Sequence, residues 1–226
     1  GEFRIPAPET VKDKNSPYYG YTVVNNNGRP NTSATDYEYL GKAEADFTMG
    51  FTTNLRWKNF SFSATADWRK GGLMYSNTAY ITHFNGNSTQ TVYNERNAFI
   101  YPNTVKIVNG EYVENNIMVK SNEMHSNYNY SNNPYVRRNI VLPKDYFKLR
   151  EVSLTYDFPK NLLTKTPFKK VMVSLVGRNL LLFTPKKNNY IDPESTNLGN
   201  DLTSEFGETT GTSSTRNFGA NIKVVF

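Results

Sequence analysis

The stretch AEADFTMGFTTNLRWKNFSFSATADWR, Ala43–Arg69, decides the fold because its side chains alternate between apolar and polar. Up to Trp57, the odd positions carry only Ala, Phe, Met, Thr, Leu and Trp. After Lys58–Asn59 the apolar set moves to the even positions, from Phe60 to Trp68, opposite Ser, Thr, Asp and Arg. A period of two is typical of a strand with two unlike faces. The stretch therefore predicts an antiparallel hairpin with a tight turn.

Each strand of this hairpin has the length needed to cross a bilayer when tilted. The polar face carries charges of both signs, which suits a wet lumen better than a dry protein core, although a solvated outer face is the simpler alternative. Hydropathy plots miss such strands because only alternate residues face lipid. We expect these charged residues to face a lumen: Glu44, Asp46, Arg56, Asp67, Arg69 and, from a later strand, Arg178.

Three later segments show the same alternation, at Arg150–Pro159, Val171–Phe183 and Arg216–Phe226. Upstream of the first segment the apolar phase slips near Arg150, which a β-bulge would explain. The second segment is apolar on both faces in its later part. Together with the hairpin, these segments predict five antiparallel strands, which is an all-β fold.

The connections between the strands differ in length. Lys58–Asn59 is tight and Pro159–Lys170 is moderate, whereas residues 70–145 and 184–216 are long and polar, as is the leading segment 1–43. This is the plan of an outer-membrane barrel with short periplasmic turns and long extracellular loops. Met74–Phe84 is then expected to extend the second strand or to form an extracellular hairpin. The expected organisation is an extracellular segment at 1–43, a transmembrane hairpin at 44–69, a strand extension and long extracellular loop at 70–145, transmembrane strands at 146–183 with a periplasmic turn at 159–170, an extracellular loop at 184–216 and a closing strand at 217–226.

Composition excludes several classes of function. The chain has 226 residues without a single Cys, which removes disulfides, thiolate chemistry and cysteine-based zinc sites. The net charge of +6 is scattered, so no basic tract favours nucleic acid. His83 and His125 lack the spacing of a zinc site. A calcium site among the loosely clustered acids from Asp192 to Glu208 is less expected than a solvated loop. We expect no cofactor, no metal and no enzymatic activity.

Four motifs in order carry a resemblance to a known family. FKLREVSLTYDFPKNLL, VMVSLVGRNLLLFT, YIDPE and the closing FGANIKVVF resemble the C-terminal part of SusC/RagA-type TonB-dependent transporters. The hairpin with its WKNF turn is also similar to theirs. The resemblance covers residues 40–80 and 146–226. It departs at Lys186–Asn189, and residues 85–145 match nothing in the family pattern.

The resemblance implies a 22-stranded transmembrane β-barrel with a plug, energised by the TonB complex and capped by a SusD-like lipoprotein. Such a protein lies in the outer membrane of a Gram-negative bacterium, in contact with its lipid, and imports glycans or peptides. Since five strands cannot close a barrel, the N-terminal remainder of the protein would supply the other strands, the plug and the contact with TonB.

Two groups of residues acquire expected roles. Phe218 and Phe226 lie on the apolar face of the closing strand and resemble the C-terminal signal that directs barrel assembly. Loop tyrosines have amphipathic rings suited to contact with a substrate or a lid protein: Tyr75, Tyr80, Tyr93, Tyr128, Tyr130 and Tyr135. The alternative is a secreted soluble β-sandwich that binds carbohydrate or acts as an adhesin; fractionation without detergent distinguishes the two.

Overall fold

The computed structural model describes residues 1–119, 133–197 and 205–226. His125, Tyr128 and Tyr130 lie outside the described residues. The chain forms two compact units. Unit 1 comprises Gly1–Ala43, Leu73–Leu142 and Thr196–Gly211, and unit 2 comprises Glu44–Gly72, Pro143–Ser195 and Thr212–Phe226.

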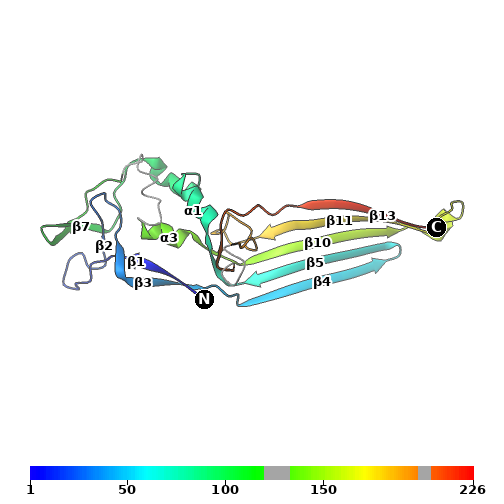
Figure 1. Ribbon diagram of the computed structural model, residues 1–226, viewed down its shortest axis with the longest axis horizontal. Helices are drawn as coiled ribbons and strands as arrows, with labels where there is room; N and C mark the ends of the chain where they lie inside the picture. Colours follow the sequence, from blue (N-terminus) through cyan, green and yellow to red (C-terminus); the bar gives the residue numbers. More distant parts are fainter. Residues whose placement is uncertain (120–132, 198–204) are drawn as a thin grey trace. The chain divides into compact units, whose positions relative to one another are not determined.

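Unit 2 is built on one antiparallel sheet of five strands (Figure 1). Its order is β13-β11-β10-β5-β4, so each strand pairs with the members of this sheet that come before and after it in the sequence. The fold class expected from alternation is confirmed, and the sheet does not close into a barrel within the described residues. The strands are β4 (Phe47–Trp57), β5 (Phe60–Lys70), β10 (Tyr146–Asp157), β11 (Lys170–Phe183) and β13 (Asn217–Val225), with the short helix α4 (Lys160–Leu163) between β10 and β11.

The β4–β5 turn has the two residues that the sequence predicts. Trp57 pairs with Phe60, and Lys58 takes a left-handed backbone conformation with φ of 51°. The side-chain amide of Asn59 donates to the carbonyl oxygen of Asp157 on β10 at 2.8 Å. The turn is thus tied to the next strand of the sheet.

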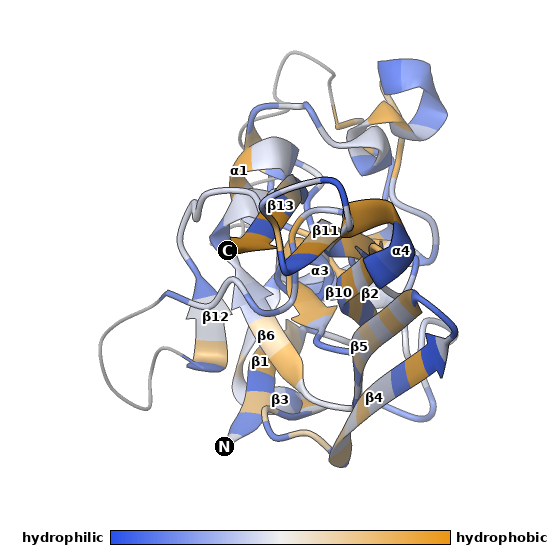
Figure 2. Cartoon of the chain, turned by 90° about the vertical axis from the view of Figure 1, so that its right-hand side faces the viewer, coloured by the Kyte–Doolittle hydropathy of each residue, from blue (hydrophilic) through white to orange (hydrophobic). Residues whose placement is uncertain are grey.

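The register places the apolar positions of all strands on one face. Leu55 lies opposite Phe62, Phe62 opposite Leu154, Leu154 opposite Leu175, and Leu175 opposite Ala220. The next row across the sheet, from Asn54 on β4 to Gly219 on β13, belongs to the other face. Figure 2 shows the resulting bands of apolar and polar residues along β4 and β5.

The phase slip near Arg150 is a β-bulge. The register of β10 shifts between Leu149 and Glu151 against both β5 and β11. On β11 the shift coincides with Asn179, whose φ is 52°. The bulge lets Leu149 and Val152 share the apolar face, opposite Ala66 and Ala64.

Unit 1 consists of small sheets and short helices around a conventional core (Figure 1). Val11, Val23 and Val105 form a fully buried cluster, against which Tyr18 and Tyr21 pack. No helix in the described parts of the chain is long and apolar enough to span a membrane. The elements are β1 (Glu2–Pro8) with β3 (Thr32–Lys42); β2 (Thr22–Val23) with β7 (Thr104–Val108) and β8 (Glu111–Glu114); β6 (Leu73–Ser76) with β9 (Val141–Pro143) and β12 (Gly207–Glu208); and α1 (Asn77–Phe84), the 3-10 segment η1 (Thr89–Arg96) and α3 (Pro134–Asn139).

The expectation for Met74–Phe84 is wrong. The segment is neither a strand extension nor a hairpin, because β6 stops at Ser76 and α1 follows. The Ser76 hydroxyl accepts from the Ala79 amide at 3.0 Å as the helix cap. The buried carboxylate of Glu208 accepts from the Thr78 amide at 2.8 Å. A partner 130 residues away thus fixes the start of the helix, and local alternation does not contain that information.

Candidate functional site

The charged residues expected to face a lumen share the polar face of the sheet where they lie on strands. Arg56 is opposite Ser61, Asp67 is opposite Lys148, and Arg178 is opposite Glu151. Arg69 occupies the same face, opposite Thr48 and Tyr146. Glu44 and Asp46 precede β4, where the Asp46 amide donates to the Lys70 carbonyl at 2.8 Å.

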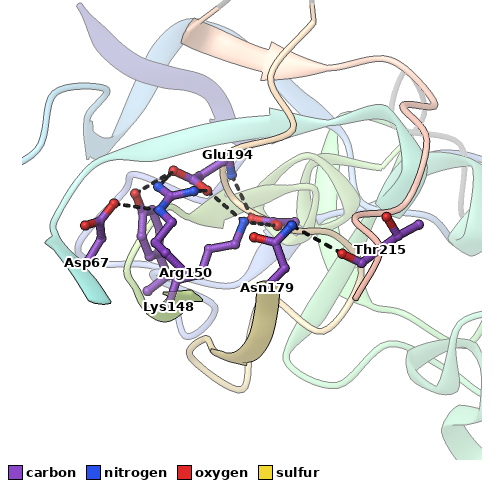
Figure 3. Close-up of polar contacts among 8 residues, drawn as sticks. Asp67, Lys148, Arg150, Asn179, Glu194 and Thr215 are labelled. Carbon is purple, nitrogen blue, oxygen red and sulfur yellow. Dashed lines mark hydrogen bonds and ion pairs between the residues drawn. The ribbon is translucent and has the colours of Figure 1, made fainter. Parts of the chain in front are cut away.

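A network of ion pairs lies on this face at the start of β10 (Figure 3). Lys148 Nζ contacts Asp192 Oδ2 at 2.7 Å and Glu194 Oε2 at 2.8 Å. The side chains of Lys148 and Asp192 are only 6% and 4% exposed. Arg150 Nε contacts Asp67 Oδ2 at 2.7 Å, and its Nη1 donates to Glu194 Oε2 at 2.8 Å. Two cations from the strand are therefore neutralised by three carboxylates.

The network holds the Asp192–Glu194 segment against the sheet. The Tyr146 hydroxyl donates to Glu194 Oε1 at 2.8 Å, and the Glu194 amide donates to Asp192 Oδ1 at 3.1 Å. Burial alone would raise the pKa of Glu194, but hydrogen bonds from Arg150, Lys148 and Tyr146 outweigh burial and lower the pKa to about 2. These carboxylates pair with cations, and no group of three metal ligands occurs among the described residues.

Two further contacts continue the polar face along the strands. The hydroxyls of Ser63 and Ser153 lie 2.7 Å apart, and Arg178 Nε donates to Glu151 Oε2 at 2.8 Å. At the bulge in β11, the Asn179 amide donates to the carbonyl of Thr215 at 3.2 Å (Figure 3). The face is suited to contact with water or polar protein surface, not to a dry core.

The opposite face exposes large apolar side chains. Leu154 and Leu175 are 43% and 59% exposed although both lie on inner strands. On the outer strand β13, Phe218 is 79% exposed. Aromatic rings gather at the turn end of the sheet, where Phe60 lies 4.8 Å from Tyr156 between ring centroids.

A separate pocket in unit 1 brings together aromatic side chains from distant parts of the sequence. Its volume is about 330 Å³. The ring centroids of Tyr93 and Phe99 are 4.8 Å apart, those of Phe99 and Tyr101 are 5.0 Å apart, and those of Tyr101 and Tyr135 are 6.3 Å apart. Gln90, Asn133 and Asn139 add side-chain amides to the lining.

The structure brings together two of the candidate tyrosines, Tyr93 and Tyr135, in this pocket. Tyr75 donates instead to Asn77 Oδ1 at 3.3 Å, and Tyr80 packs against Phe84 with ring centroids 5.9 Å apart. Sequence reasoning missed Phe99, Tyr101, Lys148 and Arg150. Lys148 alone carried a usable signal, because it is a charged residue with the parity of a strand's polar face.

Known proteins give a consistent set of similarities, although no family model matches the chain. The chain is 28% identical over 174 residues to the TonB-dependent receptor P3 of Formosa agariphila, covering 77% of this chain and 15% of the receptor. The RagAB peptide importer in its closed-closed state has a TM-score of 0.59 at 20% identity, over 98% of this chain and 22% of the importer chain. The open-open state gives a TM-score of 0.60 at 20% identity, over 99% and 22% of the two chains.

These similarities confirm the resemblance to SusC/RagA-type transporters. The fold of the chain is that of a portion of a RagA-like β-barrel protein, and the chain spans less than a quarter of each relative. The relatives are outer-membrane receptors and transporters of Gram-negative bacteria, not enzymes, which agrees with the localisation and the non-enzymatic role expected from the sequence.

Proposed function

We propose that this chain is part of a TonB-dependent importer in the outer membrane and that unit 2 forms a sector of the barrel wall. The observation that carries the proposal is the reversed burial in unit 2. Among the described residues of this unit, no Ala, Val, Leu, Ile, Met, Phe, Tyr or Trp side chain is buried, whereas Lys148 and Asp192 are.

Water is a poor solvent for such a sheet. Transfer of one large apolar side chain from water to an apolar medium is favourable by about 1.5–3 kcal/mol of free energy. The apolar row continues across five strands and exposes Leu55, Leu154 and Leu175, which is far more than the scattered apolar residues of a soluble surface. A bilayer satisfies this face while the polar face meets a lumen. A soluble β-sandwich would instead cover the apolar face with a second sheet.

The strand connections suggest an orientation. The turn at Lys58–Asn59 and the connection 159–170 leave the same end of the sheet, as expected for periplasmic turns. The strand ends at residues 47, 70, 146, 183 and 217 lie at the opposite end of the sheet, which would then be the extracellular one. The free edges of β4 and β13 would pair with strands supplied by the remainder of the protein, which also carries the plug and the contact with TonB.

The remaining roles concern partners and assembly. We infer that nutrient, as glycan or peptide, passes along the polar face and that a SusD-like lipoprotein acts as the extracellular lid. Phe218 on the apolar face of β13 and Phe226 directly after β13 act in assembly. Phe226 packs against Phe168 with ring centroids 5.3 Å apart.

Fractionation of the full-length protein tests the proposal. The protein should remain in the membrane pellet after a carbonate wash, enter solution only with detergent and migrate as a heat-modifiable band. Recovery in the soluble fraction without detergent would contradict the proposal.

A matched pair of variants tests the assembly role. Phe226→Ala should lower the yield of the heat-modifiable form several-fold, whereas Val225→Ala, on the other face of the strand, should leave the yield close to that of the parent. Equal yields for the two variants would show that Phe226 has no specific role in assembly.

A further inference from the structure

We propose that the aromatic pocket of unit 1 binds one neutral pyranose ring of a glycan. This inference rests on the proposed importer function and assigns a substrate class to one site. The pocket volume of about 330 Å³ is at the lower end for small-molecule sites, which suits one sugar residue rather than a longer chain.

The walls of the pocket offer rings in several orientations. Tyr93 meets Phe99, and Phe99 meets Tyr101, edge to face at interplanar angles of 74° and 68°. Tyr101 stacks on Tyr135 at 25°. A pyranose has faces covered by C–H groups, which pack on aromatic rings, and an edge of hydroxyls, which need polar partners. Because the aromatic rings stand at different angles to one another, they can contact both the apolar face of a pyranose and its adjoining edge.

One polar partner is held in place before any ligand arrives. One terminal atom of the Gln90 amide lies 2.9 Å from Nε2 of the buried His83. The other Gln90 amide atom, the Asn139 amide and the Tyr93 hydroxyl have no hydrogen-bond partner among the described residues. Asn133 is already engaged, since its amide donates to the Tyr101 hydroxyl at 2.9 Å and fixes that ring. Donors and acceptors for sugar hydroxyls are thus available.

The lining is neutral, which selects among ligands. Among the described residues, none that lines the pocket is Asp, Glu, Lys, Arg or His. A peptide terminus, a charged peptide side chain, a uronate or a sulfate would lose its hydration without gaining a counter-charge there. A neutral sugar carries no such penalty, and its hydroxyls match the amides.

Binding to the full-length protein in a detergent without a sugar headgroup tests the inference. The probes are the methyl pyranosides of glucose, galactose and mannose, with glucuronic acid and tri-alanine as comparisons, measured by saturation-transfer NMR. At least one methyl pyranoside should bind in preference to both comparisons.

Variants locate the site. Tyr93→Ala should weaken the affinity for the bound methyl pyranoside about tenfold or more. Tyr93→Phe keeps the ring and loses the hydroxyl, so it should weaken the affinity less, by about threefold. Tyr112→Ala removes an exposed tyrosine outside the pocket and should have no effect.

Three results would overturn the inference: no saturable binding of any methyl pyranoside, pyranoside binding that Tyr93→Ala leaves unchanged, or binding of tri-alanine that Tyr93→Ala abolishes. The heat-modifiable band is recorded on the same samples. A membrane-inserted barrel that fails to bind sugar refutes only the pocket assignment, whereas a protein soluble without detergent refutes the importer function itself.

Discussion

The two units bury opposite kinds of side chain. Unit 1 contains all the buried Ala, Val, Leu, Ile and Met side chains of the described residues, among them Met74 and Leu142 at 0% exposure. Unit 2 buries Lys148 and Asp192 while Leu175 is 59% exposed. One chain therefore follows the rule of soluble proteins in one unit and reverses it in the other.

This contrast shows that the kinds of side chain that a unit buries depend on the medium around it as well as on the residue type. A soluble domain removes its apolar atoms from water by packing them together. In unit 2 the sheet leaves them exposed, and under the proposed function the bilayer around the sheet would remove them from water. Under the proposed function the reversed unit would be the membrane part, and the conventional unit has the kind of core found in water-exposed proteins.

The largest effect is expected from Asp192→Ala, which leaves the buried ammonium of Lys148 with a single partner. Breaking a buried pair costs about 3–5 kcal/mol, and Glu194 should keep the loss near the lower value. Hydrogen exchange of the full-length protein should show faster exchange in residues 184–195 and at the start of β10.

The matched control is Glu111→Ala, at an exposed position, which should change stability by less than about 0.5 kcal/mol. If Asp192→Ala changed stability as little as this control, the buried ion pair of Lys148 and Asp192 would not stabilise unit 2.

The next effect compares neighbouring positions on opposite faces of β5. Ala64→Arg places a charge on the apolar face and should cost about 2–4 kcal/mol if that face meets lipid. Thr65→Arg places it on the polar face and should cost about 1 kcal/mol or less. Unfolding by urea in lipid vesicles measures both. If Thr65→Arg cost more than Ala64→Arg, the polar face and not the apolar face would be the one that meets lipid.

A smaller contrast separates the two kinds of apolar environment. Leu142→Ala in unit 1 leaves a cavity, whereas lipid can refill the space left by Leu175→Ala in unit 2. The first variant should therefore lose about 1–2 kcal/mol more than the second. Local hydrogen exchange in each unit gives the two values, and equal losses would imply that protein packs against Leu175.

The smallest effect is a dependence on pH. Because the pKa of Glu194 is lowered from 4.5 to about 2, its ion pairs stabilise the fold above pH 4.5, and this contribution is lost as the pH falls toward 2. Protection of residues 184–195 should decline over that range in the parent protein. Glu194→Gln should flatten this part of the profile, and an unchanged slope would exclude Glu194 as the titrating group.

Sequence predicted the strands of unit 2 because the information is local. Alternation shows that Phe62 and Ser63 lie on opposite faces of the sheet, and the slip at Arg150 revealed the bulge. The same rule failed in unit 1, where α1 starts at a cap completed by Glu208 from far along the chain. Alternation also failed to predict the pocket, because Tyr93 and Tyr135 come together through tertiary packing, which produces no periodic pattern in the sequence.

The most direct test of the central claim places spin labels at single cysteines along β5 of the full-length protein in lipid vesicles, since these 226 residues contain no Cys. Labels at positions 60, 62, 64, 66 and 68 should be accessible to oxygen from the bilayer, and labels at 61, 63, 65 and 67 to a water-soluble nickel complex. Opposite phases for the two reagents are the predicted result. Water-soluble nickel reaching the even positions as readily as the odd ones would contradict the claim that the apolar face of this sheet meets lipid.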